Sequence, residues 1–385
     1  MKPTIDPRRA PLLLAFAAAV SIAAPSRADD AQPVPATAVE SADLQRWGLV
    51  PILMSNAETG VQAGALVIRY LNPGDTLNKS STFGFAARVS QKMQVEVNLF
   101  PEWYLKENLY HVTADLNYIR WPADFYGLSN ASDIPKDSAD PYLAQGVNGS
   151  LTVERKLLPG FSLGPQALFK YEDIEADGDP VLFTDAVPGF KGGLSSGIGA
   201  VMTLDKRDEI YWARSGCLLR TKVAWYRGAW GSEFDFDSYS FEARRFLPLF
   251  ETGAVGVAAT LQLKNGDVPF RELSTPDGDH IMRGMVRGKY RDRHLLVVQG
   301  EYKSYLPDWH WLSAPWIRNR LGWAVFTEAG QVAHEVGDFA MDQFRTDFGF
   351  GIRYAMNPDQ KMNIRVDIGF VDGSVAPAIN IKEAF

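Results

Sequence analysis

The chain has 385 residues, of which 46% are hydrophobic and 22% charged, and its formal net charge is −7. An acidic chain weighs against a nucleic-acid binder, because contacts with phosphates need a net basic face. The single cysteine, Cys217, excludes an intrachain disulfide framework.

The N-terminus has the three regions of a secretory signal peptide. Lys2, Arg8 and Arg9 precede an apolar run that ends at Ala24, and small residues around Ala28 suit a cleavage site. The apolar run is well short of the ~20 residues that a membrane-spanning helix needs. We therefore expect residues 1–28 to be removed. This takes away four cations and one anion and moves the net charge from −7 to −10.

Residues 29–46 are small, polar and rich in Pro and Ala. They predict a short periplasmic lead-in that is too small to bury a core. No later run is long and apolar enough for a transmembrane helix. An exported chain of this kind is a periplasmic protein, a secreted protein or an outer-membrane barrel, and the distribution of apolar residues must decide.

From Trp47 onward, apolar and polar residues alternate with a period of two. In residues 110–118 the apolar face has a tyrosine at each end, while His111, Asp115 and Asn117 occupy the other face. Alternation alone also fits a soluble sheet. Charges on one face and aromatic ends on the other fit a barrel with lipid outside and water inside.

The alternation predicts sixteen strands, and their number is even, as is usual in bacterial barrels. The predicted strands are 47–55, 60–71, 79–91, 92–104, 107–120, 141–157, 160–176, 193–206, 216–230, 233–248, 251–265, 291–306, 319–331, 344–356, 361–371 and 376–385. Backbone groups in lipid must all be hydrogen-bonded, so the first and last strands are expected to meet. We therefore predict an all-β fold over residues 47–385, a transmembrane antiparallel β-barrel of about 16 strands.

The connections between these strands give an independent indication. Taken alternately, the long ones are 121–140, 177–192, 266–290 and 332–343, and they fall on one side of the barrel. The other side has mostly short turns, although 306–319 is long. Bacterial barrels have long outer loops and short periplasmic turns.

The segment from Met282 to Arg293 contains five basic residues, Arg283, Arg287, Lys289, Arg291 and Arg293, in an otherwise acidic chain. These cations would either be solvated in an outer loop or reach into the lumen. A buried guanidinium needs anionic partners. Glu328 and Asp367 both alternate onto the polar faces of their strands. The face on which a residue lies does not decide whether the cations are solvated outside or docked in the lumen.

Four motifs occur in an order and spacing typical of one family. Residues 121–130 resemble a loop with the pattern Phe-Tyr-Gly-x-Gly-Asn, with Ser129 at the second Gly. Asp205, Arg207, Asp208 and Gly216 are similar to an Asp-x-Arg-Asp periplasmic turn, with Ala213 where Pro is usual. The third motif is Arg283, Gly284 and Met285, where Met285 replaces an aromatic residue. The fourth comprises residues 327–330, Arg365, Asp367 and the terminal Phe385.

In this order the chain resembles the BamA/TamA family of outer-membrane barrels, also called the bacterial surface antigen family. The resemblance implies that the long outer loop folds inward and that Arg283 docks on Glu328, and we add Asp367 as a second partner. Phe385 would be the signal that the barrel assembly machinery reads. Relatives that insert or secrete proteins have periplasmic substrate-capturing domains before the barrel, and here residues 29–46 stand in that place.

The resemblance therefore implies a non-enzymatic protein of the bacterial outer membrane, of the insertase/translocase superfamily, in membrane biogenesis or in passage of a protein or lipid. Its expected partners are outer-membrane lipid, the barrel assembly machinery and a separate periplasmic protein, with no nucleic acid, cofactor or metal. One alternative is a passive channel or structural barrel. Another is an outer-membrane lipase, which rests only on Ser195 in the string Gly193–Gly197.

Overall fold

A computed structural model of the chain describes residues 47–56, 60–71, 79–129, 134–135, 138–277, 281–306, 320–357, 362–371, 374–381 and 383–384. The expected signal peptide (1–28), the expected lead-in (29–46) and Phe385 lie outside the described residues. The same is true of Asn130 in the first family motif and of most of the long connection 306–319.

Sixteen strands make up nearly all of the described chain. They are β1 (Trp47–Asn56), β2 (Gly60–Tyr70), β3 (Thr82–Ser90), β4 (Val95–Leu105), β5 (Tyr110–Phe125), β6 (Asp140–Leu158), β7 (Phe161–Ala176), β8 (Gly192–Asp205), β9 (Gly216–Tyr226), β10 (Phe236–Leu249), β11 (Gly253–Gly266), β12 (His294–Tyr305), β13 (Leu321–Ala333), β14 (Arg345–Asn357), β15 (Met362–Val371) and β16 (Ser374–Ile381). Short 3₁₀ turns interrupt some connections: η2 (Gly228–Trp230), η3 (Phe270–Glu272), η4 (Val336–Asp338) and η5 (Met341–Gln343).

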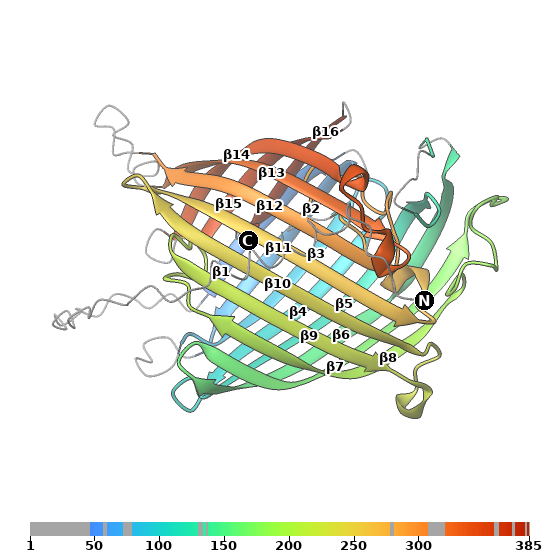
Figure 1. Cartoon of the computed structure of the whole chain (residues 1–385), viewed down its shortest axis with the longest axis horizontal. Coiled ribbons are helices and arrows are strands. Elements are labelled where there is room, and N and C mark those ends of the chain that lie inside the picture. Colours follow the sequence, from blue (N-terminus) through green and yellow to red (C-terminus); the bar gives the residue numbers. More distant parts are fainter. Residues whose placement is uncertain are drawn as a thin grey trace, which may run out of the picture.

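The strands form one antiparallel sheet in which each pairs with its neighbours in sequence, from β1 to β16. Figure 1 shows them side by side at a common tilt, from blue to red along the chain. The prediction of an all-β antiparallel barrel is confirmed. The two end strands, β1 and β16, lie close together, but no hydrogen-bonded ladder joins the described residues of one to those of the other. The first and last strands therefore lie close together, as expected, but their described residues are not paired.

The two faces of the sheet differ as the alternation predicts. In β14, Phe348, Phe350 and Ile352 are 63%, 48% and 58% exposed, whereas the alternating residues Asp347 and Arg353 are 1% and 0% exposed. Successive side chains of a strand point to opposite faces, so the charges of β14 point into the barrel and its large apolar groups point outward.

Some strand ends differ from the prediction. β5 continues to Phe125 instead of residue 120, because the long β6 keeps pairing with it as far as Phe125 opposite Asp140. β9 ends at Tyr226, and the expected continuation to residue 230 is the 3₁₀ turn η2. Among the described residues, no helix has the length and apolar character needed to cross a membrane.

Candidate functional site

The connection between β11 and β12, residues 267–293, is called here the lumen loop. It begins with η3 and returns toward β12 through an antiparallel bridge between Ser274 and Asp292. A second bridge pairs Asp277 with Met282. The loop thus has its own local structure, and two of its arginines, Arg271 and Arg283, contact the wall.

Arg283 lies against three carboxylates from three different strands. Its Nε donates to Glu328 Oε1 at 2.8 Å and its Nη1 to Glu301 Oε2 at 2.6 Å, while Nη1 lies 3.5 Å from Asp367 Oδ2. The side chain of Arg283 is fully buried. Burial by itself lowers the pKa of Arg283, but the three carboxylates outweigh it and raise this pKa. The guanidinium is therefore held as a cation.

Other contacts fix the orientation of this arginine. The backbone N–H of Arg283 donates to Glu328 Oε2 at 2.7 Å, and its Cζ lies 3.4 Å from the ring centroid of Phe326. Gln299 Nε2 donates to Glu328 Oε1 at 3.0 Å and to the Ile281 carbonyl at 2.5 Å. A cation above an aromatic face and a paired carboxylate both favour the docked position.

Gly284 brings the backbone of the loop against the wall. Its N–H donates to Asp347 Oδ2 at 2.8 Å. A Cβ on Gly369 of β15 would lie 2.7 Å from Gly284 Cα, so the wall also needs a glycine at this point. Met285, which replaces the aromatic residue of the family motif, is buried in an apolar cluster with Met282, Tyr290, Leu295, Val297, Val332 and Val371.

The carboxylates around Arg283 belong to a larger ion-pair network. Arg353 Nη1 donates to Asp367 Oδ1 at 2.6 Å and its Nη2 lies 3.4 Å from Glu301 Oε2. Its Nε donates to Glu383 Oε2 at 2.9 Å, which ties the chain beyond β16 to the lumen face of β14. Arg365 also pairs with Asp367. The network therefore links the lumen loop to the strands nearest the sheet edge at β16.

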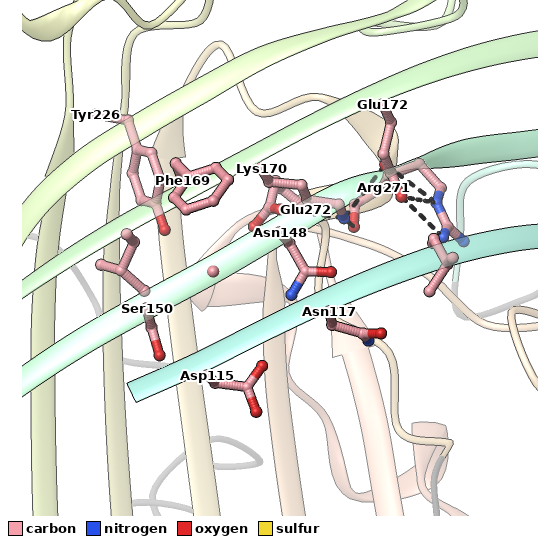
Figure 2. A pocket seen from close by; sticks show the side chains of 13 residues that line it. Asp115, Asn117, Asn148, Ser150, Phe169, Lys170, Glu172, Tyr226, Arg271 and Glu272 are labelled. Carbon is pink, nitrogen blue, oxygen red and sulfur yellow. Dashed lines mark hydrogen bonds and ion pairs between the residues drawn. The ribbon is translucent and has the colours of Figure 1, made fainter. Parts of the chain in front are cut away.

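Arg271 anchors the other side of the lumen loop. Its Nη2 donates to Glu172 Oε1 of β7 at 3.1 Å, and its Nη1 donates to the Tyr142 hydroxyl at 3.3 Å. Lys170 Nζ lies 3.1 Å from Glu272 Oε1 and 3.4 Å from Glu172 Oε2. Figure 2 shows Lys170, Glu172, Arg271 and Glu272 on the wall of a cavity of about 370 Å³. The loop therefore crosses the barrel from β7 to β12, β13 and β15.

The first family motif contacts the same loop. Phe125 packs against Phe270 of η3, with ring centroids 5.6 Å apart, and Ser129 forms a bridge with Arg291. Arg291 Nη1 donates to the Phe270 carbonyl at 2.8 Å. Of the five cations in the basic run, Arg283 and Arg291 are buried, whereas Arg287 is exposed.

The second motif closes a compact turn between β8 and β9. Arg207 donates twice to Asp205, from Nε to Oδ1 at 2.9 Å and from Nη2 to Oδ2 at 2.8 Å. The Asp208 carboxylate accepts from the backbone N–H groups of Arg214 and Ser215 at 3.0 and 3.2 Å. Gly216 has φ of +94°, and a Cβ there would lie 2.0 Å from the Lys206 carbonyl oxygen. This turn needs glycine.

The same turn also reaches into the lumen. Trp212 is buried and its ring centroid lies 4.3 Å from that of Tyr305 in β12. Ala213 packs with Phe246, Ala258 and Ala384. The motif thus contacts both the wall and the last described residues of the chain.

The matched family model is that of the Omp85 superfamily domain, over residues 76–370. The chain belongs to the Omp85 superfamily. No curated protein matches the sequence.

Two solved structures share the fold of this Omp85 barrel. BamA from Haemophilus ducreyi lacking POTRA domains 1–3 matches with a TM-score of 0.57 and 11% identity, over 87% of this chain and 70% of that chain. CdiB from Acinetobacter baumannii matches with a TM-score of 0.54 and 11% identity, over 88% of this chain and 60% of that chain. This chain therefore spans less than two thirds of CdiB, and at such low identity the similarity concerns the fold.

The sequence interpretation had not included Glu301, Arg271 or Glu172. Alternation places Glu301 on the polar face of its segment with Gln299 and Lys303, which predicts that it faces the lumen but not that it pairs with Arg283. The pairing of Arg271 with Glu172 joins residues about a hundred positions apart, and no local signal marks it.

The remaining motifs do not gather into a second site. Ser195 lies within β8, which leads through a turn to β9, so the strand-turn-helix context of a nucleophile elbow is missing in this described segment. The string Asp277-Gly-Asp279-His280 has the residue types for a divalent ion but is also ordinary for a loop tip, and its residues Asp279 and His280 lie outside the described residues. Within the described residues, no group of three His, Cys, Asp or Glu side chains could hold a metal ion.

Proposed function

We propose that this Omp85 barrel is a non-enzymatic outer-membrane protein of the insertase/translocase type, acting in outer-membrane biogenesis or in the passage of a protein or lipid. The observation that carries the proposal is the docking of Arg283 on Glu301, Glu328 and Asp367, which braces β12, β13 and β15. A loop held in this way obstructs the lumen, which suits a barrel that works at its wall better than an open pore.

The seam between β1 and β16 is the second support. The two strands approach each other, but the described residues form no ladder between them. Unpaired strand edges are templates for pairing with another chain. An opening seam would let a nascent strand or a lipid pass sideways into the membrane.

The proposed partners follow from this role. Outer-membrane lipid surrounds the apolar outer face, and the barrel assembly machinery inserts the chain. A separate periplasmic protein would deliver the substrate at the end of the barrel that bears the turn from Asp205 to Gly216. The proposed location is the bacterial outer membrane, reached by export with the signal peptide of residues 1–28.

A disulfide across the seam tests the proposal. Pairs of cysteines are placed along β1 and β16 in a Cys217→Ala background, since Cys217 is the one native thiol. The readout is the outer-membrane protein and lipid composition of cells that depend on the variant. We expect the oxidised lock to abolish function and a reductant to restore it.

The matched control is a disulfide between strands that are already paired. Gly48 of β1 faces Ile68 of β2, and a Cβ on Gly48 would lie 3.9 Å from Ile68 Cβ, a separation that suits a disulfide. Gly48→Cys with Ile68→Cys should leave function intact. A seam lock that is tolerated as well as this control would instead favour a passive channel or structural barrel.

A further inference from the structure

A cavity of about 220 Å³ lies in the lumen beside the docked loop, on the inner faces of β9, β10 and β11. Its lining residues are Arg220, Lys222, Ser240, Glu242, Arg244, Ala258, Thr260 and Gln262, with Ile281 of the lumen loop and Gln299 of β12. The volume is several times the ~30 Å³ that one water occupies in the liquid. A small hydrated ion or ester therefore fits.

Strand register arranges these side chains in rows. Lys222 faces Ser240, and Ser240 faces Gln262 on the next strand. Two residues further along each strand, Arg220 faces Glu242, and Glu242 faces Thr260. Residues two apart on a strand share a face, so both rows point into the same cavity. The result is a patch of hydrogen-bond donors on a rigid wall.

The charges of this patch do not cancel. It has three cations and one carboxylate, and Glu242 forms its ion pair with Arg244. Neither Arg220 nor Lys222 forms an ion pair with any carboxylate of the described residues. Arg220 Nε is buried and has no hydrogen-bond partner there. Glu154 and Glu242 act on Arg220 and Lys222 only at longer range, without forming ion pairs with them, and Glu154 is engaged by His111 Nδ1 at 3.6 Å.

The larger cavity shown in Figure 2 makes the contrast clear. There the cations Lys170 and Arg271 are paired with Glu172 and Glu272. The smaller cavity lacks such ion pairs for Arg220 and Lys222, and a buried donor such as Arg220 Nε is costly to leave without a partner. Two positive charges thus remain to be balanced.

We propose that this patch is a binding site for a phosphate-type oxyanion, with Arg220 and Lys222 as the charged ligands and Ser240, Thr260 and Gln262 as neutral donors. A guanidinium matches two oxygens of a phosphate, and an ammonium adds a point charge. A dianion balances the two uncompensated cations. Walls of low dielectric strengthen this attraction.

The test is equilibrium binding to the full barrel in a nonionic detergent. Flow dialysis with radiolabelled inorganic phosphate, at ionic strength held constant with sodium chloride, should give one saturable site per chain. Lys222→Gln should weaken binding at least tenfold, and this side chain is exposed in the lumen, so the barrel should still fold. Lys156→Gln, the same change at an exposed lysine near the end of β6, should leave binding unchanged.

A second variant changes affinity in the opposite direction. Glu242→Gln releases Arg244 from its ion pair and should tighten phosphate binding severalfold, which loss of structure would not do. Non-saturable uptake by the wild-type protein would overturn the proposal, as would equal affinity of wild type and Lys222→Gln.

A parallel titration with dihexanoyl phosphatidic acid distinguishes a lipid headgroup from a free phosphate as the ligand. Competition with phosphate and tighter binding indicate a lipid headgroup, whereas no gain over phosphate indicates a free phosphate.

Discussion

Gly369 of β15 lies directly against Gly284 of the lumen loop, so closely that a Cβ on Gly369 would be 2.7 Å from Gly284 Cα and 2.8 Å from Gly284 N. The two glycines allow two backbones to touch. This approach lets the Gly284 N–H reach Asp347 and places Arg283 among its carboxylates.

Gly369→Ala should lift the lumen loop from the wall, at a cost of about 1 to 3 kcal/mol for the overpacked contact. Hydrogen–deuterium exchange of residues 281–293 in the folded barrel measures the effect, and faster exchange is expected. Gly300→Ala is the matched control, because its Cβ would meet nothing nearer than Thr327 Cγ2 at 3.9 Å. Equal exchange in the two variants would contradict the role of the glycine contact.

Arg283→Ala should destabilise the barrel by about 3 to 5 kcal/mol, because Glu328 would remain buried without its cation and Glu301 would keep only Arg353, at 3.4 Å. Urea unfolding followed by tryptophan fluorescence measures this change. Arg283→Lys should recover only part of the loss, since an ammonium cannot reproduce the fork of a guanidinium. Arg287→Ala, at an exposed position of the same loop, is the control. Unfolding of Arg283→Ala at the wild-type urea concentration would refute the prediction.

Arg271 and Glu172 should be energetically coupled. A double-mutant cycle with Arg271→Ala and Glu172→Gln is expected to give a coupling of about 0.5 to 3 kcal/mol, as is usual for residues in one network. The Arg227–Asp237 pair serves for comparison, because its side chains are 38% and 27% exposed and such pairs contribute at most about 1 kcal/mol. Additive effects of the Arg271 and Glu172 changes would rule out this second anchor.

Gly216→Ala should impair folding of the turn between β8 and β9. The residue has φ of +94° and no room for a Cβ, and a strained backbone of this kind costs about 1 to 3 kcal/mol. The yield of refolded, heat-modifiable barrel is the measurement, and it should fall. Gly228→Ala should refold normally, because a Cβ there meets nothing within 4 Å. A normal yield for Gly216→Ala would argue against a structural need for the motif.

Deletion of Phe385 should reduce accumulation in the outer membrane, if the terminal aromatic residue is the signal for assembly. Quantitative immunoblotting of outer-membrane fractions measures this, with Phe385→Tyr as a control that keeps an aromatic end. Full assembly of the deletion variant would defeat this prediction.

Much of the wall could be predicted from alternation, because the side chains of a strand have a strict period of two and lipid and water select opposite chemistry. The strand ends were less certain: β5 extends to Phe125 only because the partner strand β6 is long enough to continue the ladder. The basic run pointed to Arg283, whereas Glu328 came from the family resemblance and Asp367 from the polar face of its strand together with its place in the family motif. Glu301 lies among residues of the same polar face, but nothing local distinguishes it from Gln299 or Lys303.

The sequence by itself determined the sixteen-stranded barrel and its inner and outer faces, since these depend on local periodicity. Only the tertiary structure decided which charges meet: Arg283 with Glu301, Arg271 with Glu172, and Arg220 and Lys222 left without a carboxylate partner among the described residues. Such pairings depend on strand register and on the path of the lumen loop across the barrel. Both bring together residues far apart in the chain, and no local pattern encodes that distance.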